Sequence, residues 1–130
     1  MELKICIYRG THQIGGIAAE ISTEKTRILI DMGDELSVDP DFVPAPLNIP
    51  GVTDTNGRCD AVLFTHYHGD YIGQMARIRP EIPLYAGALA KDIMLLYELT
   101  KCVFENLCIR YDVHCPGQFD KLYAAELCEV

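Results

Sequence analysis

The sequence lacks the usual marks of a secreted or membrane protein. No apolar run approaches the ~18 residues of a membrane span, and the first residues carry neither a basic start nor a long apolar stretch. Six cysteines are present, and no two of them form a C-x-x-C pair. We therefore expect a cytoplasmic protein with reduced, partly buried thiols. A structural zinc site built from cysteines is the alternative interpretation.

Basic residues are scarce and scattered. The chain has 11 Lys and Arg residues against 19 Asp and Glu residues, a net charge of −8. Phosphate contacts in nucleic-acid complexes need clustered basic side chains, so this balance argues against nucleic-acid binding by the chain alone. Hydrophobic residues make up 49% of the 130 residues, and no low-complexity run is present. These properties predict one folded domain.

Short apolar segments alternate with helical ones along the chain. The second and third of these apolar segments should pair as a hairpin. A longer helix is indicated by Leu89, Ile93 and Leu96, which recur at helical spacing. Such alternation is typical of an α/β layered domain. The expected strands are residues 3–8, 17–22, 27–31, 60–64, 83–86 and, in the irregular tail, 107–111; the expected helices are residues 71–79, 88–104 and 120–127.

Residues 34–58 differ from the segments on either side. Pro40, Pro44, Pro46 and Pro50 exclude a long regular element there. A connection of this length inside a compact domain is usually functional or partly disordered. Because it comes just before the histidine-rich segment, a rim or lid beside a functional site is a reasonable hypothesis.

The segment after the fourth expected strand carries the strongest chemical signal. It reads Thr65-His66-Tyr67-His68-Gly69-Asp70-Tyr71-Ile72-Gly73. In an extended turn, His66 and His68 can project to the same side, and Asp70 follows where a helix begins. Imidazoles and a carboxylate suit Zn²⁺, Mn²⁺ or Fe²⁺. A metal there could generate hydroxide near neutral pH.

Simpler interpretations of the same residues remain open. Asp70 could be a helix N-cap that accepts backbone N–H groups of the first turn. The two histidines could be no more than exposed loop residues. Tyr71 is a poor metal ligand as a neutral phenol, and packing of its ring against the first helical turn is the simpler interpretation.

The segment resembles motif 2 of the metallo-β-lactamase superfamily, T-H-x-H-x-D-H. Two upstream stretches, residues 8–16 with an Ile-Gly-Gly turn and residues 28–33 ending in Asp-x-Gly, are similar to the opening of the ribonuclease J-like branch. Residues 82–85 match the short strand that follows motif 2 in that branch. The resemblance covers about residues 3 to 100.

This resemblance implies roles for individual residues. His66 and His68 would bind a first metal, Zn²⁺ or Mn²⁺, and Asp70 would bind a second metal and take part in catalysis. Asp31 would orient the ligand loop from behind the ligands; its alternative is a turn residue before Gly33. His12 matches no ligand of the family and is expected on the surface.

Two departures from the family pattern also follow. Tyr71 stands where the family has a histidine for the second metal. The only later histidine, His114, has surroundings unlike the next motif. The resemblance therefore implies a single domain over residues 1–130 that is the N-terminal half of an αββα sandwich, a mixed β-sheet covered by helices. Its last 30 or so residues would be either a divergent ending or a disrupted reading frame.

The expected function is a metal-dependent hydrolase of phosphodiesters or esters, incomplete in this chain. The alternative is a non-catalytic remnant or interaction module with at most one weakly bound metal, so the sequence leaves open whether the chain is itself an enzyme. Half a sandwich would leave an apolar sheet face in water, which is costly at ~25 cal/mol per Å². We therefore expect a homodimer, or a partner chain that covers this face.

Overall fold

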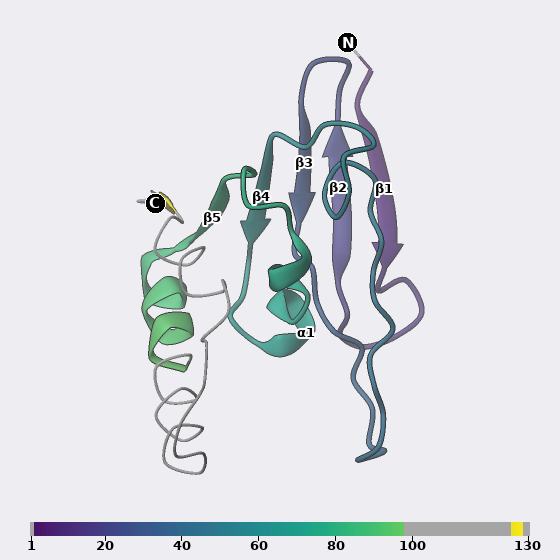
Figure 1. Cartoon of the computed structure of the whole chain (residues 1–130), viewed down its shortest axis with the longest axis vertical. Coiled ribbons are helices and arrows are strands. Elements are labelled where there is room, and N and C mark those ends of the chain that lie inside the picture. Colours follow the sequence, from purple (N-terminus) through teal and green to yellow (C-terminus); the bar gives the residue numbers. More distant parts are fainter. Residues whose placement is uncertain (1, 98–125, 129–130) are drawn as a thin grey trace.

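The computed structural model describes residues 2–97 and 126–128, which form one mixed β-sheet with few helices (Figure 1). Six strands lie side by side in the order in which they occur in the chain. The first three are antiparallel to one another, and the third to the sixth are parallel. The strands are β1 (Lys4–Arg9), β2 (Ala18–Ser22), β3 (Arg27–Ile30), β4 (Ala61–Phe64), β5 (Leu84–Gly87) and β6 (Glu126–Cys128). The α/β class, the mixed sheet and the predicted hairpin of β2 and β3 are confirmed.

The predicted helix over residues 71–79 is wrong as one continuous element. The structure has a short helix α1 (Gly69–Ile72) and a separate 3-10 turn η1 (Met75–Arg77). The cause is the backbone of Met32, whose N–H donates to the carbonyl of Tyr71 (2.8 Å) and whose carbonyl accepts from the N–H of Gln74 (2.9 Å). Because the Tyr71 carbonyl and the Gln74 N–H bond to Met32 in the loop after β3, they do not continue the helix, and α1 ends.

The predictions for the tail have mixed outcomes. Residues 88–97 are helical, which confirms the first part of the predicted helix over 88–104. The predicted helix over 120–127 is wrong at its end, because Glu126 and Leu127 belong to β6 and pair in parallel with β5. Residues 98–104, the predicted strand 107–111 and residues 120–125 lie outside the described residues.

The hydrophobic core lies on one face of the sheet. Leu29, Val62 and Leu84 are neighbours across β3, β4 and β5, and they are only 1%, 0% and 4% exposed. Alternation along each strand sends these side chains to the same face. Figure 1 shows α1 and the 34–58 connection crossing that face. The apolar side chains that cover it include Ile49 from the connection and Ile78 from just after η1.

The other face of the sheet, here called the open face, is also aliphatic. Cross-strand partners place Ile5, Ile21 and Ile28 in one row, and Ile30 beside Leu63 in another. The open face is defined by Ile5, Ile7, Ile21, Ile28, Ile30 and Leu63, none of which belongs to the core cluster of the described residues. Ile5 and Ile7 are 66% and 53% exposed, and the other four are half-buried. Within the described residues, one sheet face is covered and the other is left apolar, as the sequence led us to expect.

A buried ion pair ties the 34–58 connection to the covered face. Arg27 contacts Glu20 at 2.8 Å, and Glu20 also accepts a hydrogen bond from the Tyr8 hydroxyl at 2.6 Å. The same guanidinium donates to the carbonyls of Pro50 (2.6 Å) and Arg58 (2.9 Å). Burial, followed by the hydrogen bond to Glu20, raises the pKa of Tyr8 to about 12, so the phenol stays neutral. The later part of the connection is therefore fixed to the sheet.

Two further expectations concern thiols and membranes. Cys6 is exposed, Cys59 is half-buried, and both are free thiols. The other four cysteines lie outside the described residues. In the described part of the chain, no helix is both long enough and apolar enough to cross a membrane.

The unequal faces of the sheet give a stability prediction. Leu29→Ala removes a side chain that is 1% exposed, and should lower the free energy of unfolding by about 2–5 kcal/mol. Ile30→Ala, one residue away on the open face, should cost no more than about half of that, because part of the Ile30 side chain already lies in water. Urea denaturation at low protein concentration, where no second chain covers the open face, measures both. Equal losses would contradict a core confined to one face.

Candidate metal centre

The loop after β4 brings the two histidines together. β4 ends at Phe64, and His68 is the N-cap residue of α1, so His66 lies in the short turn between them. His66 Nε2 and His68 Nδ1 are 2.8 Å apart, and the two rings meet edge to face with centroids 4.2 Å apart. His66 is half-buried and His68 is exposed. The two ring nitrogens are within hydrogen-bonding distance of each other, so both rings lie on the same side of the turn, as their spacing predicts.

Asp31 holds the start of this loop. Its Oδ1 accepts the backbone N–H of Thr65 at 2.8 Å, and its Oδ2 accepts the Thr65 hydroxyl at 2.6 Å. Asp31 leaves β3 with a φ of +59° and is only 2% exposed. Burial raises the pKa of this carboxyl above its usual range, against the two Thr65 hydrogen bonds, which lower it. Asp31 therefore fixes the residue directly before His66, which supports an orienting role.

Asp70 lies in the first turn of α1 rather than at its cap. The N-cap is His68, with no side-chain capping bond, so the N-cap interpretation of Asp70 is wrong. A Cβ on Gly33 would overlap the Asp70 carbonyl, and one on Gly15 would lie 2.8 Å from the Asp70 Cβ. Gly15 and Gly33, one from each upstream stretch, thus leave room for Asp70 of α1 to pack against them. The carboxylate charge of Asp70 also acts to raise the pKa of Asp31.

The predicted ligands fit a metal only in part. Among residues 2–97 and 126–128, no group of three or more His, Cys, Asp or Glu side chains is arranged to hold a metal ion. The imidazoles of His66 and His68 have the right chemistry for Zn²⁺. Two nitrogens bound to one zinc stand roughly 3.4 Å apart, so these two, which are 2.8 Å apart and hydrogen-bonded to each other, would have to separate to hold one ion. The pair can fill two coordination positions. The assignment of Asp70 as a ligand stays a prediction.

Two tyrosines enclose the His66 ring. The Tyr67 ring stacks on it with a centroid distance of 4.9 Å, and the Tyr71 ring meets it at 5.0 Å with a 64° angle between the planes. Tyr71, for which packing of the ring was the simpler interpretation, contacts the imidazole of His66. Sequence patterns assigned Tyr67 no role, because one aromatic residue between two histidines has no distinctive pattern. Both rings restrict how His66 can turn.

Gln74 is a positioning residue that no sequence pattern singled out. It is 5% exposed, and its amide nitrogen donates to Asp34 Oδ1 (2.8 Å) and to the Ala45 carbonyl (3.1 Å). Its amide oxygen accepts the Leu47 N–H at 2.8 Å. One buried amide thus connects the segment after α1 to the start and to the middle of the loop between β3 and β4.

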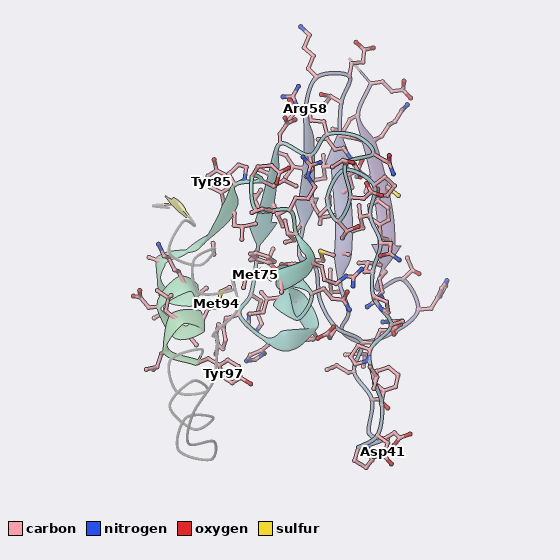
Figure 2. All side chains as sticks on the ribbon, in the orientation of Figure 1. Asp41, Arg58, Met75, Tyr85, Met94 and Tyr97 are labelled. Carbon is pink, nitrogen blue, oxygen red and sulfur yellow. The ribbon has the colours of Figure 1, made fainter. Side chains whose placement is uncertain are left out.

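The base of the 34–58 connection lies close to α1. Leu36 lies within 2.9 Å of a Cβ built on Gly15, in the same gap that Asp70 borders. Beyond it the connection projects past the strand ends near which α1 lies, and Figure 2 shows Asp41 at its tip. The role of a rim or lid stays a prediction. His12 is exposed, as expected, and His114 lies outside the described residues.

The Asp31 contacts give a prediction about stability. Asp31→Ala removes both acceptors of Thr65 and places alanine at a positive φ, whereas Asp31→Asn keeps an acceptor and tolerates that backbone conformation. The alanine variant should be less stable than the asparagine variant by about 1–3 kcal/mol in urea denaturation. Equal stability would show that the Thr65 contacts do not hold the loop.

Comparison with known proteins finds a relative in sequence and similar solved structures. No family model matches the chain. It is 31% identical over 100 residues to the transcription termination factor FttA of Methanosarcina mazei, and spans 15% of that protein's length and 75% of its own. It also superposes, with a TM-score of 0.59, on a protein of unknown function from Enterococcus faecalis. That superposition is 17% identical in sequence and covers the whole of this chain and 34% of that one, so it establishes a shared fold alone.

Proposed function

We propose that this chain carries part of the metal centre of a hydrolase of the metallo-β-lactamase superfamily, related to the ribonuclease J-like branch. The observation that carries the proposal is the convergence of His66 Nε2 and His68 Nδ1 at the end of β4, behind which Asp31 fixes Thr65. Similarity to a termination factor of the metallo-β-lactamase family supports it. The six-stranded sheet would then be one half of the αββα sandwich.

Different residues would have different roles in such a site. His66 and His68 would hold Zn²⁺ or Mn²⁺, and Asp70, half-buried in the first turn of α1, would serve a second ion. A divalent metal held there supplies hydroxide near neutral pH and positive charge to offset the charge that develops on the attacked ester. Tyr67 and Tyr71 keep the His66 ring in place. The partners of Asp31 keep the loop from moving.

The net charge of the chain disfavours some classes of substrate. A net charge of −8 repels long polyanions unless basic side chains are clustered, and here they are scattered. Small phosphodiesters or esters are therefore favoured over long nucleic acids as substrates for this chain acting alone.

A second candidate is a non-catalytic interaction module with at most one weakly held metal. Two observations favour it: Tyr71 replaces a good ligand, and the described residues contain no three-ligand group. In this role a partner chain would cover the open face. Metal content separates the two candidates, since the hydrolase needs a tightly held ion and the module does not.

The hydrolase proposal predicts metal binding at the histidine pair. The wild-type chain should bind zinc or manganese near stoichiometrically and hydrolyse a small phosphodiester such as bis-p-nitrophenyl phosphate. The double variant His66→Ala His68→Ala should lose at least about tenfold in metal affinity and the activity with it. His12→Ala, at an exposed histidine, is the matched control and should change neither quantity. Titration calorimetry and elemental analysis measure binding. Metal-free wild-type protein that stays inactive after metal reloading would support the interaction module instead.

Tyr71 offers a gain-of-binding prediction. Its ring centroid is 5.0 Å from that of His66, so Tyr71→His adds a third imidazole beside the pair. Zinc should then bind at least about tenfold more tightly, because imidazole is a better ligand than a neutral phenol. Tyr71→Phe keeps the ring and adds no ligand, so its zinc affinity should stay at the wild-type level. An unchanged affinity in Tyr71→His would place the bound metal away from α1.

A further inference from the structure

The open face differs in chemistry from the covered one. The strand positions of β1 to β4 that share the open face carry aliphatic side chains, whereas the charged partners Glu20 and Arg27 lie on the covered side. The register joins Ile7, at the edge of the sheet, to Leu63 in β4 through the intervening residues of β2 and β3. The result is one continuous aliphatic surface without hydrogen-bonding side chains.

The exposure of this surface is greatest at the edge strand. Ile5 and Ile7 are 66% and 53% exposed, and Leu3, two residues before Ile5, is 60% exposed. Among residues 2–97 and 126–128, β1 has a neighbouring strand on one side only. Natural proteins normally protect edge strands with charges, prolines or bulges. β1 has a bulge between Ile7 and Arg9, but its open-face residues Ile5 and Ile7 are aliphatic. A contiguous apolar surface at an edge strand marks a contact site.

We propose that a second copy of this chain covers the open face in a two-fold symmetric, sheet-to-sheet contact. This inference rests on the interaction role named above and supplies its partner. A flat aliphatic surface cannot select a partner by hydrogen bonds or charge, so its best complement is another surface of the same kind. Sheets of this kind pack about 10 Å apart with interdigitating side chains. An identical chain provides such a surface, and two-fold contacts of like with like are the commonest in oligomers.

The size of the surface agrees with a dimer. Four strands at about 4.8 Å spacing make the aliphatic surface roughly 20 Å wide. A standard interface of about 800 Å² per partner is roughly 30 Å across, with an apolar centre and a polar rim. The open face from β1 to β4 therefore has the dimensions of the centre of such an interface.

The charge of the chain gives the dimer a distinctive salt dependence. Each copy carries a net charge of −8, so two copies repel each other over the length that salt does not screen. Contact through aliphatic side chains is not weakened by salt. Raising NaCl from about 0.05 M to about 0.5 M should therefore strengthen the dimer, whereas a contact held by ion pairs would weaken.

Sedimentation equilibrium over about 1–100 µM protein tests the inference. The wild-type chain should sediment at twice the monomer mass at the upper end of this range. The double variant Ile5→Glu Ile7→Glu should raise the dissociation constant at least about tenfold, because it places carboxylates in the contact. Val38→Glu Val43→Glu is the matched control, at apolar residues that are 105% and 83% exposed outside the open face, and it should remain dimeric.

Two further measurements distinguish loss of the dimer from misfolding of a variant. The far-ultraviolet circular dichroism of the Ile5 and Ile7 variant should match wild type, and the melting temperature of the wild-type chain should rise with its concentration. A wild-type chain that stays monomeric over the whole concentration range would overturn the inference. So would a wild-type chain whose open face is occupied by a different protein. A dimer that persists in Ile5→Glu Ile7→Glu would overturn it too. His66→Ala His68→Ala should still dimerise, so failure of the metal site and failure of the dimer are distinguishable.

Discussion

The Asp31 carboxylate, which accepts both the N–H and the hydroxyl of Thr65, is the interaction on which the rest of the site depends. It joins the end of β3 to the end of β4 at the residue before His66. The backbone just after Asp31 continues the connection, since the Asp34 N–H donates to the carbonyl of Gly69 at 3.0 Å. One short loop thus holds both ends of the histidine segment. A buried carboxylate of raised pKa is tolerated because these donors surround it.

Sequence patterns predicted the strands well and the helices less well, for a physical reason. The residues that favour a strand lie within β2 and β3 themselves, and a short turn joins the two strands. The hairpin could therefore be predicted from local sequence. The break after α1 comes from the distant backbone of Met32, which leaves no local trace. Likewise, helical spacing selected Leu89 and Leu96, which are 73% and 61% exposed, whereas Met94 is buried at 3%. The side of that helix that faces the core depends on tertiary packing.

The candidate site divides in the same way. His66 and His68 are near neighbours in the chain, so their spacing was enough to bring their rings together. The part played by Gly15 and Gly33 in admitting α1 depends on contacts between residues more than 30 positions apart. Gln74 acts through the same kind of contact. Local motifs thus identify the reactive groups, and the fold decides how firmly these groups are held.

The order of the strands has a consequence for how the chain acquires its structure. Each strand of the sheet pairs with the strand that immediately precedes it in the chain. During synthesis, every new strand therefore finds its partner already made, and the β1–β2–β3 meander can form before β4 leaves the ribosome. Contacts between consecutive elements also favour fast folding. The sheet can grow in one direction, from the N-terminal edge inward, as the chain is translated.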